Sequence, residues 1–364
     1  MYKRAVDLEA LRHNIDAIDN ELLSLLARRA QLLPQVIAAK QSKGLPVVDP
    51  ERERALLDRL VERGADPFPS EAIRAVFREI MSASVSLQRP IRVSFLGPPG
   101  TWSHLAARQM FGFAPQYLEE STMSAVVDAV RRGRSDHGVI PVENSTEGSV
   151  SPAVDALLAG GVMIRRELIL PIEHCLMSRT SDLSGLRRVF SHAQALGQCR
   201  NWLAENLPSA QLVQTASTTV AVQEASSDPE AAAVGSPFAS ELFGLPIVRE
   251  RIQDHAGNAT RFLMVSTEDA SPTGDDRTTI AFALSDDGEK GALRRALEDI
   301  EEAGVNMTRI ESRPRPGASW RYVFLADLVG HRTEAPVASA LDRLERRSEG
   351  VRVLGSYPRF VPSD

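Results

Sequence analysis

Apolar residues recur at intervals of three and four along the first part of the chain. The run comprises Leu8, Leu11, Ile15, Ile18, Leu22, Leu25, Leu32 and Val36. This spacing predicts a long helix with one apolar face, which spans on the order of 50 Å at 1.5 Å per residue. Pro34 lies within the run and is expected to bend the helix, because proline removes a backbone donor and crowds the preceding turn.

Two shorter helices are predicted to complete an all-helical domain over residues 1–90. One begins at Asp49-Pro50, an N-cap residue followed by proline, and the other is capped by Ser70 and ends at Arg89-Pro90. Two short helices cannot cover the long apolar face. The pattern therefore predicts a partner helix from a second copy of the chain, and so a homodimer.

The pattern changes at Ile91, where short apolar runs such as "IRVSFLG" and "HGVIPV" alternate with helical stretches. This alternation predicts an α/β domain with a largely parallel sheet over residues 91–266. The polar stretch "STEDASPTGDD" reads as a linker. Residues 277–364 then follow a βαββαβ order, which predicts a ferredoxin-like domain.

Composition excludes several classes of function. With 364 residues, 43% hydrophobic, 25% charged and a net charge of -6, the chain gives no electrostatic case for binding nucleic acid or an anionic membrane. It has no apolar run of about 18 residues, so no membrane span is expected. The charged N-terminus and two lone cysteines, Cys175 and Cys199, favour a cytoplasmic protein. The seven histidines are dispersed, so we predict no metal.

Polar residues interrupt the apolar faces of the predicted helices. Arg29 takes the position between two leucines, and Lys40 lies four residues after Val36. A buried cation costs several kcal/mol unless it is paired, so these side chains imply an anionic partner. For any single residue, an internal ion pair or a side chain that reaches solvent is the better explanation. The whole set, which also includes Arg12, Glu53, Ser84 and Gln88, suits a small dianion.

The segments "LRHNIDAIDNELLSLLARR", "VVDPERERALLDRL" and "FREIMSASVSLQ" resemble the all-helical chorismate mutase domain over nearly all of residues 5–89. The resemblance implies an intertwined dimer that rearranges chorismate to prephenate by orientation and electrostatic complementarity. It implies that Arg12 reaches into the partner's site, and that Lys40 and Gln88 hydrogen-bond the ether oxygen. The implied substrate-binding residues are Arg12, Arg29, Lys40, Asp49, Arg52, Glu53, Ser84 and Gln88.

Five polar clusters in the α/β region fall at strand ends or loop-helix junctions, where open sheets place their ligands. They are "GPPGTWSH" (97–104), "PVENSTEGSV" (141–150), "SHAQALGQC" (191–199), "ASTTVA" (216–221) and "NATRF" (258–262). Each cluster alone fits a helix cap or a turn, and "GPPGTWSH" lacks the lysine of a P-loop. Five in one domain favour a binding cleft.

Together the clusters resemble prephenate dehydratase over residues 92–265. The resemblance implies two α/β lobes around a cleft, like periplasmic binding proteins. It implies decarboxylation of prephenate with loss of the ring hydroxyl, which needs no cofactor because aromatisation drives it. The implied binders of the carboxylates and the hydroxyl are Thr101, Asn144, Ser191 and Gln198.

Thr260 is assigned the catalytic role of hydrogen-bonding the hydroxyl that leaves the ring. A threonine hydroxyl is a weak acid, so a neighbour must supply or relay the proton, and Glu143 is the best candidate in the sequence. Strand alternation points Arg261 to the opposite face from Thr260, where it either anchors a carboxylate or joins a structural ion pair. Cys199 has no evident base and is rejected as a nucleophile.

"KGALRRAL" and "NMTRIESRP" resemble the ligand-binding segments of the ACT domain found on prephenate dehydratases. The spacing alone fits an ordinary loop-helix junction and a strand end equally well. The resemblance implies that L-phenylalanine binds at a dimer interface and inhibits the enzyme. Its implied contacts are Gly291, Ala292 and Leu293 at a helix start, where backbone N–H groups bind a carboxylate, and Glu311, Ser312, Arg313 and Pro314.

The sequence thus predicts a cytoplasmic, homodimeric, bifunctional chorismate mutase–prephenate dehydratase of phenylalanine biosynthesis. One alternative is a non-catalytic sensor of aromatic metabolites, which would need neither Lys40 and Gln88 in a buried seam nor Thr260 beside a carboxylate. The other is an arogenate dehydratase, against which the mutase domain argues because it makes prephenate.

Overall fold

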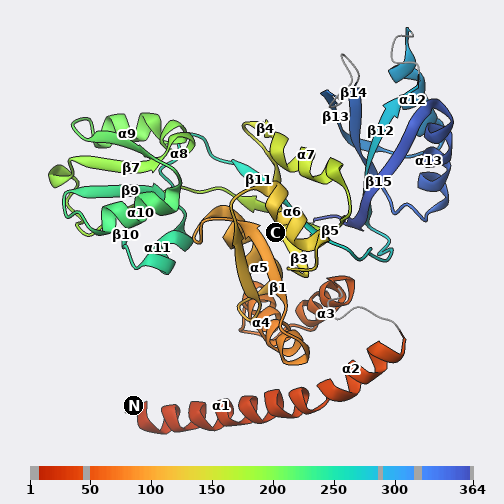
Figure 1. Cartoon of the computed structure of the whole chain (residues 1–364). Coiled ribbons are helices and arrows are strands. Elements are labelled where there is room, and N and C mark those ends of the chain that lie inside the picture. The colour runs from red at the N-terminus through yellow and green to blue at the C-terminus, as the bar shows by residue number, and fades with distance from the viewer. Residues whose placement is uncertain (1–7, 44–49, 286–289, 315–321, 361–364) are drawn as a thin grey trace, which may run out of the picture. The chain divides into compact units, whose positions relative to one another are not determined.

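The structure is a computed structural model that describes residues 8–43, 50–285, 290–314 and 322–360 (Figure 1). Its internal contacts divide the chain into two compact units. One unit comprises residues 1–91 with 111–116, and the other comprises residues 92–110 with 117–364. Among the residues described, no helix combines the length and the apolar character needed to cross a membrane.

The first unit is helical, as predicted. Its helices are α1 (Leu8–Gln31), α2 (Leu33–Ser42), α3 (Pro50–Arg63) and α4 (Ser70–Gln88). Where a bend was expected at Pro34, the structure has a break between α1 and α2. The proline sits in the first turn of α2, where its missing N–H costs nothing. The capping role predicted for Ser70 is wrong: Pro69 holds the N-cap position and makes no side-chain bond. Asp49 lies outside the described residues.

Helix α1 contains no buried residue, although it carries the long apolar run. Ile15 and Ile18 are 57% and 58% exposed, whereas α3 and α4 bury Leu57, Ile73 and Met81. An exposed apolar face of this length is typical of an interaction surface.

The second unit begins with a lobe built on a six-stranded sheet of order β2-β1-β3-β11-β5, with β4 paired to β3. Its strands are β1 (Arg92–Leu96), β2 (Gln116–Glu120), β3 (His137–Asn144), β4 (Gly148–Ser149), β5 (Met163–Pro171) and β11 (Ala259–Ser266). Its helices are α5 (Trp102–Phe111), α6 (Met123–Arg131) and α7 (Ser151–Ala159). The last two pack their apolar faces into the lobe's core.

A second lobe has a five-stranded sheet of order β10-β6-β9-β7-β8. Its strands are β6 (Cys175–Ser178), β7 (Arg188–His192), β8 (Gln211–Thr215), β9 (Ala231–Gly235) and β10 (Ile247–Arg249). Its helices are η1 (Leu183–Gly185), α8 (Ala193–Gln198), α9 (Arg200–Asn206), α10 (Thr218–Ser226) and α11 (Pro237–Phe243).

The two predicted α/β lobes are therefore present, but the prediction of a largely parallel sheet is wrong. The chain leaves the first lobe after β5 and returns as β11, which inserts antiparallel between β3 and β5. In the second lobe, β6 also runs antiparallel to β9 and β10. The returning strand sets Thr260 directly opposite Asn144 of β3, so the fold itself brings two of the predicted site residues together.

The C-terminal region has the predicted βαββαβ order. Its elements are β12 (Asp276–Leu284), α12 (Ala292–Glu302), β13 (Met307–Pro314), β14 (Tyr322–Val329), α13 (Ala335–Arg347) and β15 (Ser348–Pro358), with the sheet ordered β13-β14-β12-β15. Both helices pack on one face of this sheet. The other face contributes Ala281, Leu325 and Tyr357 to the core of the first lobe. Strand β15 approaches β5 so closely at Gly355 that a Cβ atom there would lie 2.3 Å from the Ile164 carbonyl oxygen.

Candidate active sites

The helical unit contains a cavity of about 230 Å³ in which predicted mutase residues meet. Its polar lining consists of Arg29, Lys40, Arg52, Glu53 and Ser84, and its remaining walls are apolar. Arg29 on α1 donates a hydrogen bond to Ser84 Oγ on α4, and Ser84 in turn donates to the Ile80 carbonyl oxygen at 2.6 Å. The excess of cations over carboxylates makes this pocket suited to a small dianion.

Of the other three predicted mutase residues, only Arg12 has a described side chain. Arg12 lies on the exposed helix α1 and does not line the cavity of its own chain. Asp49 lies outside the described residues. Gln88 ends α4, but its side chain lies outside the described part of the structure.

A larger cavity, of about 590 Å³, lies between the two α/β lobes. Each of the five polar clusters contributes to its lining, through Thr101, Asn144, Gln198, Ser217 and Thr260. Four of these five, all except Ser217, are among the predicted dehydratase residues. The structure therefore brings together side chains that are up to 159 positions apart, between Thr101 and Thr260.

Ser191, a predicted substrate-binding residue, does not line the cavity. Its side chain is buried and donates a hydrogen bond to the Val234 carbonyl oxygen at 2.7 Å, which ties β7 to β9. The proton of this hydroxyl is thus directed away from the cleft. In this geometry Ser191 is a structural residue that holds the sheet behind the site.

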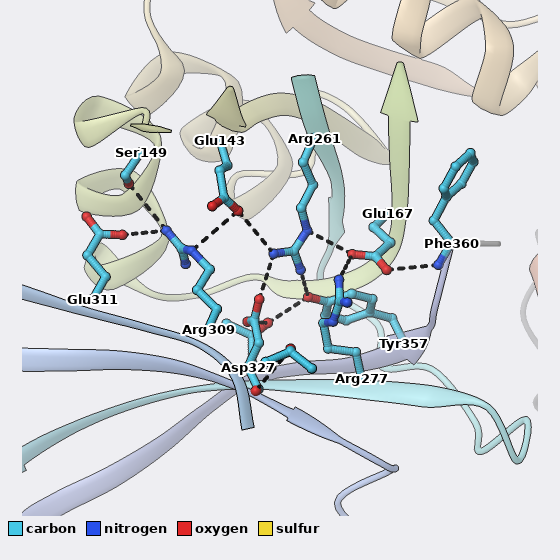
Figure 2. Close-up of polar contacts among 12 residues, drawn as sticks. Glu143, Ser149, Glu167, Arg261, Arg277, Arg309, Glu311, Asp327, Tyr357 and Phe360 are labelled. Carbon is cyan, nitrogen blue, oxygen red and sulfur yellow. Dashed lines mark hydrogen bonds and ion pairs between the residues drawn. The ribbon is translucent and has the colours of Figure 1, made fainter. Parts of the chain in front are cut away.

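Arg261 does not line the cavity to which Thr260 contributes, which agrees with the strand alternation that separates the two side chains. It joins a network of charged side chains instead (Figure 2). Its Nε donates to Glu167 at 2.8 Å, its Nη1 to Asp327 at 2.6 Å and its Nη2 to the Tyr357 hydroxyl at 2.8 Å. Burial alone would lower the pKa of Arg261, but these three partners outweigh it and raise the pKa. Of the two roles left open by the sequence, the structural ion pair is the one observed.

Arg309 of β13 extends the same network to Ser149, which lines the cleft (Figure 2). It contacts Glu311, reaches Ser149 Oγ at 3.3 Å, and places its Nε 3.4 Å from Glu143. Arg261 Nη1 lies 3.7 Å from the same carboxylate oxygen of Glu143. This carboxylate faces two guanidinium groups and does not line the cavity, so the geometry does not fit the predicted proton relay.

Among the described residues, the carboxylate that lines the cavity is that of Glu147, four residues further along. Its position follows from the β3–β4 turn, which pairs Glu143 with Ser149 and reverses the chain between them. The polar cluster "PVENSTEGSV" contains both glutamates, and its sequence offers no means of choosing between them.

Sequence reasoning missed other lining residues as well. They include Trp102, His174, His192 and Gln194. Trp102 and Gln194 belong to the polar clusters but have side chains common in cores and on helix surfaces. His174 lies outside all five clusters, in the apolar run that opens the second lobe, and nothing in its spacing marks it.

The rejection of Cys199 agrees with its surroundings. Burial raises the pKa of this thiol to about 12, and the neighbouring Asp254 and Cys175 act in the same direction. A thiol with this pKa is protonated at neutral pH and is a poor nucleophile.

His104 supports the turn that carries Thr101 into the cavity. Its Nδ1 accepts a hydrogen bond from the Gly100 N–H at 3.2 Å, and its ring stacks on Phe95 with centroids 4.5 Å apart. Gly100 has φ +88, and a Cβ there would lie 2.9 Å from the Phe243 ring. Burial, aided by the charge of Arg108, lowers the pKa of His104 to about 4.

This pKa predicts a loss of stability in mild acid. The unfolded histidine takes up a proton near pH 6.5, and the folded one only near pH 4. The contribution of the neutral ring to the free energy of unfolding is therefore complete above pH 6.5 and disappears as the pH falls toward 4. The full loss is on the order of 3 kcal/mol. The variant His104→Asn keeps an acceptor for Gly100 but does not titrate. Its free energy of unfolding, measured at pH 7 and pH 5, is expected to fall less than that of the unaltered protein; equal falls would contradict the assignment.

The proposed effector segments lie at the ends of two C-terminal elements. Gly291, with φ +81, is the N-cap of α12, and Ala292 and Leu293 form its first turn. At the end of β13, Arg313 donates to Ser151 at 2.6 Å and to Asp155 at 3.0 Å, both on α7. Among the described residues, no hydrogen bond or ion pair joins the two segments within one chain.

Fold and sites together define a class of protein that has two candidate small-molecule sites and a C-terminal βαββαβ region. One site is a cationic helical pocket, and the other is an interlobe cleft lined by hydrogen-bonding side chains. Comparisons with known proteins narrow this class. The family profile of chorismate mutase type II matches residues 11–89, and that of prephenate dehydratase matches residues 93–270. A bifunctional chorismate mutase/prephenate dehydratase of Aquifex aeolicus is 42% identical over 98% of this chain and 99% of its own length. The chain therefore belongs to the family of bifunctional chorismate mutase/prephenate dehydratases.

Two solved structures share the fold of the second unit. The prephenate dehydratase of Arthrobacter aurescens, in complex with L-Phe, has a TM-score of 0.68 and 37% identity, and the match covers 74% of this chain and 90% of that one. GqqA, a quorum-quenching acylase, has a TM-score of 0.66 and 34% identity over 73% of this chain and 97% of its own. Since one fold hosts different activities, the function rests on the full-length relatives and on the site residues.

Proposed function

We propose that the helical pocket rearranges chorismate to prephenate and that the interlobe cleft then converts prephenate to phenylpyruvate. The observation that carries the second assignment is the convergence of Thr101, Asn144, Gln198 and Thr260 on one cavity. These side chains bind a polar anion without supplying a covalent nucleophile.

In the mutase pocket, the charges of Arg29, Lys40 and Arg52 hold the two carboxylates of chorismate in the reactive conformer. The rearrangement is pericyclic, so orientation and electrostatics supply the rate enhancement. Lys40 lines the cavity and is assigned to the ether oxygen together with Gln88. Asp49 and Glu53 complete the proposed contacts to the substrate.

We also propose that the protein is a homodimer. The apolar face of α1 supports this, because it is left exposed by every residue of its own chain that the structure describes, and a second copy offers a face of matching length. The position of Arg12 on this exposed helix, away from its own cavity, fits a role in the partner's site.

In the dehydratase cleft, the bond from the ring to the departing carboxylate breaks, its electron pair enters the ring, and the C–O bond of the ring hydroxyl breaks. Prephenate dianion and one proton thus yield the phenylpyruvate anion, carbon dioxide and water. Thr260 is assigned to the departing oxygen. Glu147, which lines the cavity, is better placed than Glu143 to relay the proton.

We propose that the C-terminal region is an ACT domain that binds L-phenylalanine and inhibits the dehydratase. The complex of the Arthrobacter enzyme with L-Phe supports this assignment. The contact of Arg309 with both Glu311 and Glu143 supports coupling, because it joins the proposed effector strand to the residue before Asn144. The buried thiols of Cys175 and Cys199, which form no disulfide, fit a cytoplasmic location.

One experiment tests the whole proposal. Purified protein is mixed with chorismate alone, and prephenate and phenylpyruvate are followed over time with and without phenylalanine. Phenylpyruvate is expected to form and phenylalanine to suppress it. Accumulation of prephenate alone would remove the dehydratase assignment, and unchanged chorismate would favour a sensor. Phenylpyruvate formed at the same rate with phenylalanine present would remove the proposed regulation.

A further inference from the structure

A chain of hydrogen bonds runs across the interlobe cleft, and its direction is fixed at one end. The backbone N–H groups of Thr146 and Glu147 donate to Asn144 Oδ1 at 3.0 and 3.1 Å. A peptide N–H has no lone pair to accept with, so the atom facing it must be the amide oxygen of Asn144. This settles the orientation of a side-chain amide that is otherwise ambiguous.

The orientation of Asn144 determines that of the next amide. Its Nδ2 group donates to Thr260 Oγ1 at 2.9 Å and to the Asn258 side chain at 2.8 Å. The atom of Asn258 that accepts must be Oδ1, and the Thr146 hydroxyl lies 3.3 Å from the same atom. Asn258 Nδ2 is thereby turned toward the second lobe.

There Asn258 Nδ2 donates to Gln198 Oε1 at 3.3 Å, and His174 Nε2 approaches the same oxygen at 2.7 Å. Since this oxygen only accepts, Nε2 of His174 carries the proton. Burial lowers the pKa of His174, which keeps the ring neutral at physiological pH. Gln198 Nε2 then faces the other way, with one N–H directed toward Glu147 Oε1 at 3.4 Å.

The consequence for Thr260 is specific. Its oxygen accepts from Asn144, and no acceptor for its own proton is found among the residues that the structure describes. The hydroxyl is therefore available to donate into the cavity that Thr260 lines. Gln198 likewise presents amide N–H groups rather than its oxygen on the cavity side.

We infer that two backbone amides, acting through Asn144, Asn258, Gln198 and His174, fix the direction of this chain so that Thr260 and Gln198 donate hydrogen bonds to the substrate. Asn258 and His174 are positioning residues of the dehydratase site and act through Gln198. This inference rests on the proposed dehydratase function. It also gives the cleft the donor character that a dianionic substrate requires, and it links the two lobes, because Asn258 adjoins β11 of the first and Gln198 ends α8 of the second.

The test uses three substitutions in the full-length protein. Asn258→Asp retains an acceptor for Asn144 but cannot donate to Gln198, so the amide of Gln198 is expected to turn and present its oxygen to the substrate. His174→Leu removes the donor, whereas His174→Gln keeps an N–H near the position of Nε2. We expect kcat/KM for prephenate to fall at least about tenfold in Asn258→Asp and His174→Leu, mainly through KM, and to be largely restored in His174→Gln.

Matched controls are Asn206→Asp, which places the same charge change at an exposed site on α9, and His255→Leu, at an exposed position before β11. Both are expected to keep kcat/KM within about twofold of the unaltered protein. The mutase rate of each preparation and its melting temperature report on folding.

Several outcomes would overturn the inference. One is a kcat/KM for Asn258→Asp and His174→Leu equal to that of their controls. Another is an equal loss in His174→Gln and His174→Leu accompanied by an equal drop in melting temperature, which would mark His174 as merely structural. If the unaltered protein does not consume prephenate at all, the proposed function fails instead, and this result is distinguishable from the other two.

Discussion

Replacing Thr260 with valine is expected to lower kcat for prephenate dehydration by about two to three orders of magnitude, the effect typical of removing one transition-state donor. Valine has nearly the shape of threonine and suits a strand, so β11 and its pairing with β3 are expected to persist. Only the hydroxyl that we assign to the departing oxygen is lost. The measurement is phenylpyruvate formation from prephenate, with KM expected to change far less than kcat.

The conservative variant Thr260→Ser supplies the control, because it keeps the hydroxyl and its contact with Asn144. It is expected to retain most of the activity. The conversion of chorismate to prephenate is expected to be unchanged in both variants, because the two cavities share no residue. If valine at position 260 leaves turnover within about threefold, or if serine is as damaging as valine, Thr260 is not the group that assists departure of the hydroxyl.

Strand alternation is the most informative local rule in this sequence. It predicts that Thr260 and Arg261 lie on opposite faces, and the structure shows one in the cleft and the other in a buried network. The rule does not supply the identity of the partners. Glu167, Asp327 and Tyr357 lie 94, 66 and 96 positions away from Arg261, and no local pattern encodes such distances.

Local pattern is also insufficient to choose between the two candidates for the proton relay. Glu143 and Glu147 stand in one polar cluster, and only the tight turn between β3 and β4 sends the first toward Arg261 and the second toward the cavity. His174 was not predicted as a site residue, for a different reason. A histidine in an apolar run is most often a buried residue with satisfied contacts, and its importance appears only once Gln198 lies beside it.

For the helical unit, local sequence patterns predict more of the structure than they do for the cleft. Apolar periodicity predicts its helices and the need for a partner, and Pro34 predicts a bend in the long helix, because each follows from local sequence along one chain. The sequence also predicts that Arg29, Lys40, Arg52, Glu53 and Ser84 meet, and they line one cavity. Spacing places Arg29, Lys40, Glu53 and Ser84 on inward faces of helices that must pack together, whereas Arg52 is predicted only by the resemblance to the chorismate mutase domain. Periodicity therefore predicts part of the pocket.

Arg29→Ala is expected to lower the mutase rate by about two to three orders of magnitude and to leave dehydration of added prephenate unchanged. Arg29 lines the mutase cavity and is anchored on Ser84, so its guanidinium is held in place ahead of substrate binding. Arg29→Lys keeps the charge but not the planar pair of donors, and is expected to recover only part of the rate. Loss of both activities in a folded Arg29→Ala protein would contradict the separation of the sites.

The proposed role of Arg12 allows a sharper test of the dimer. If Arg12 serves the partner's pocket, each pocket uses Arg29 of one chain and Arg12 of the other. A mixed dimer of one Arg12→Ala chain and one Arg29→Ala chain then has both substitutions in one pocket, and its second pocket is intact. Each variant alone is expected to be nearly inactive as a mutase. Refolding the two together in equal amounts gives mixed dimers in about half of the molecules, so about a quarter of the mutase activity is expected to return. If Arg12 instead serves its own chain, every pocket keeps one substitution and no activity returns, so the recovered fraction decides whether each active site is built from two chains.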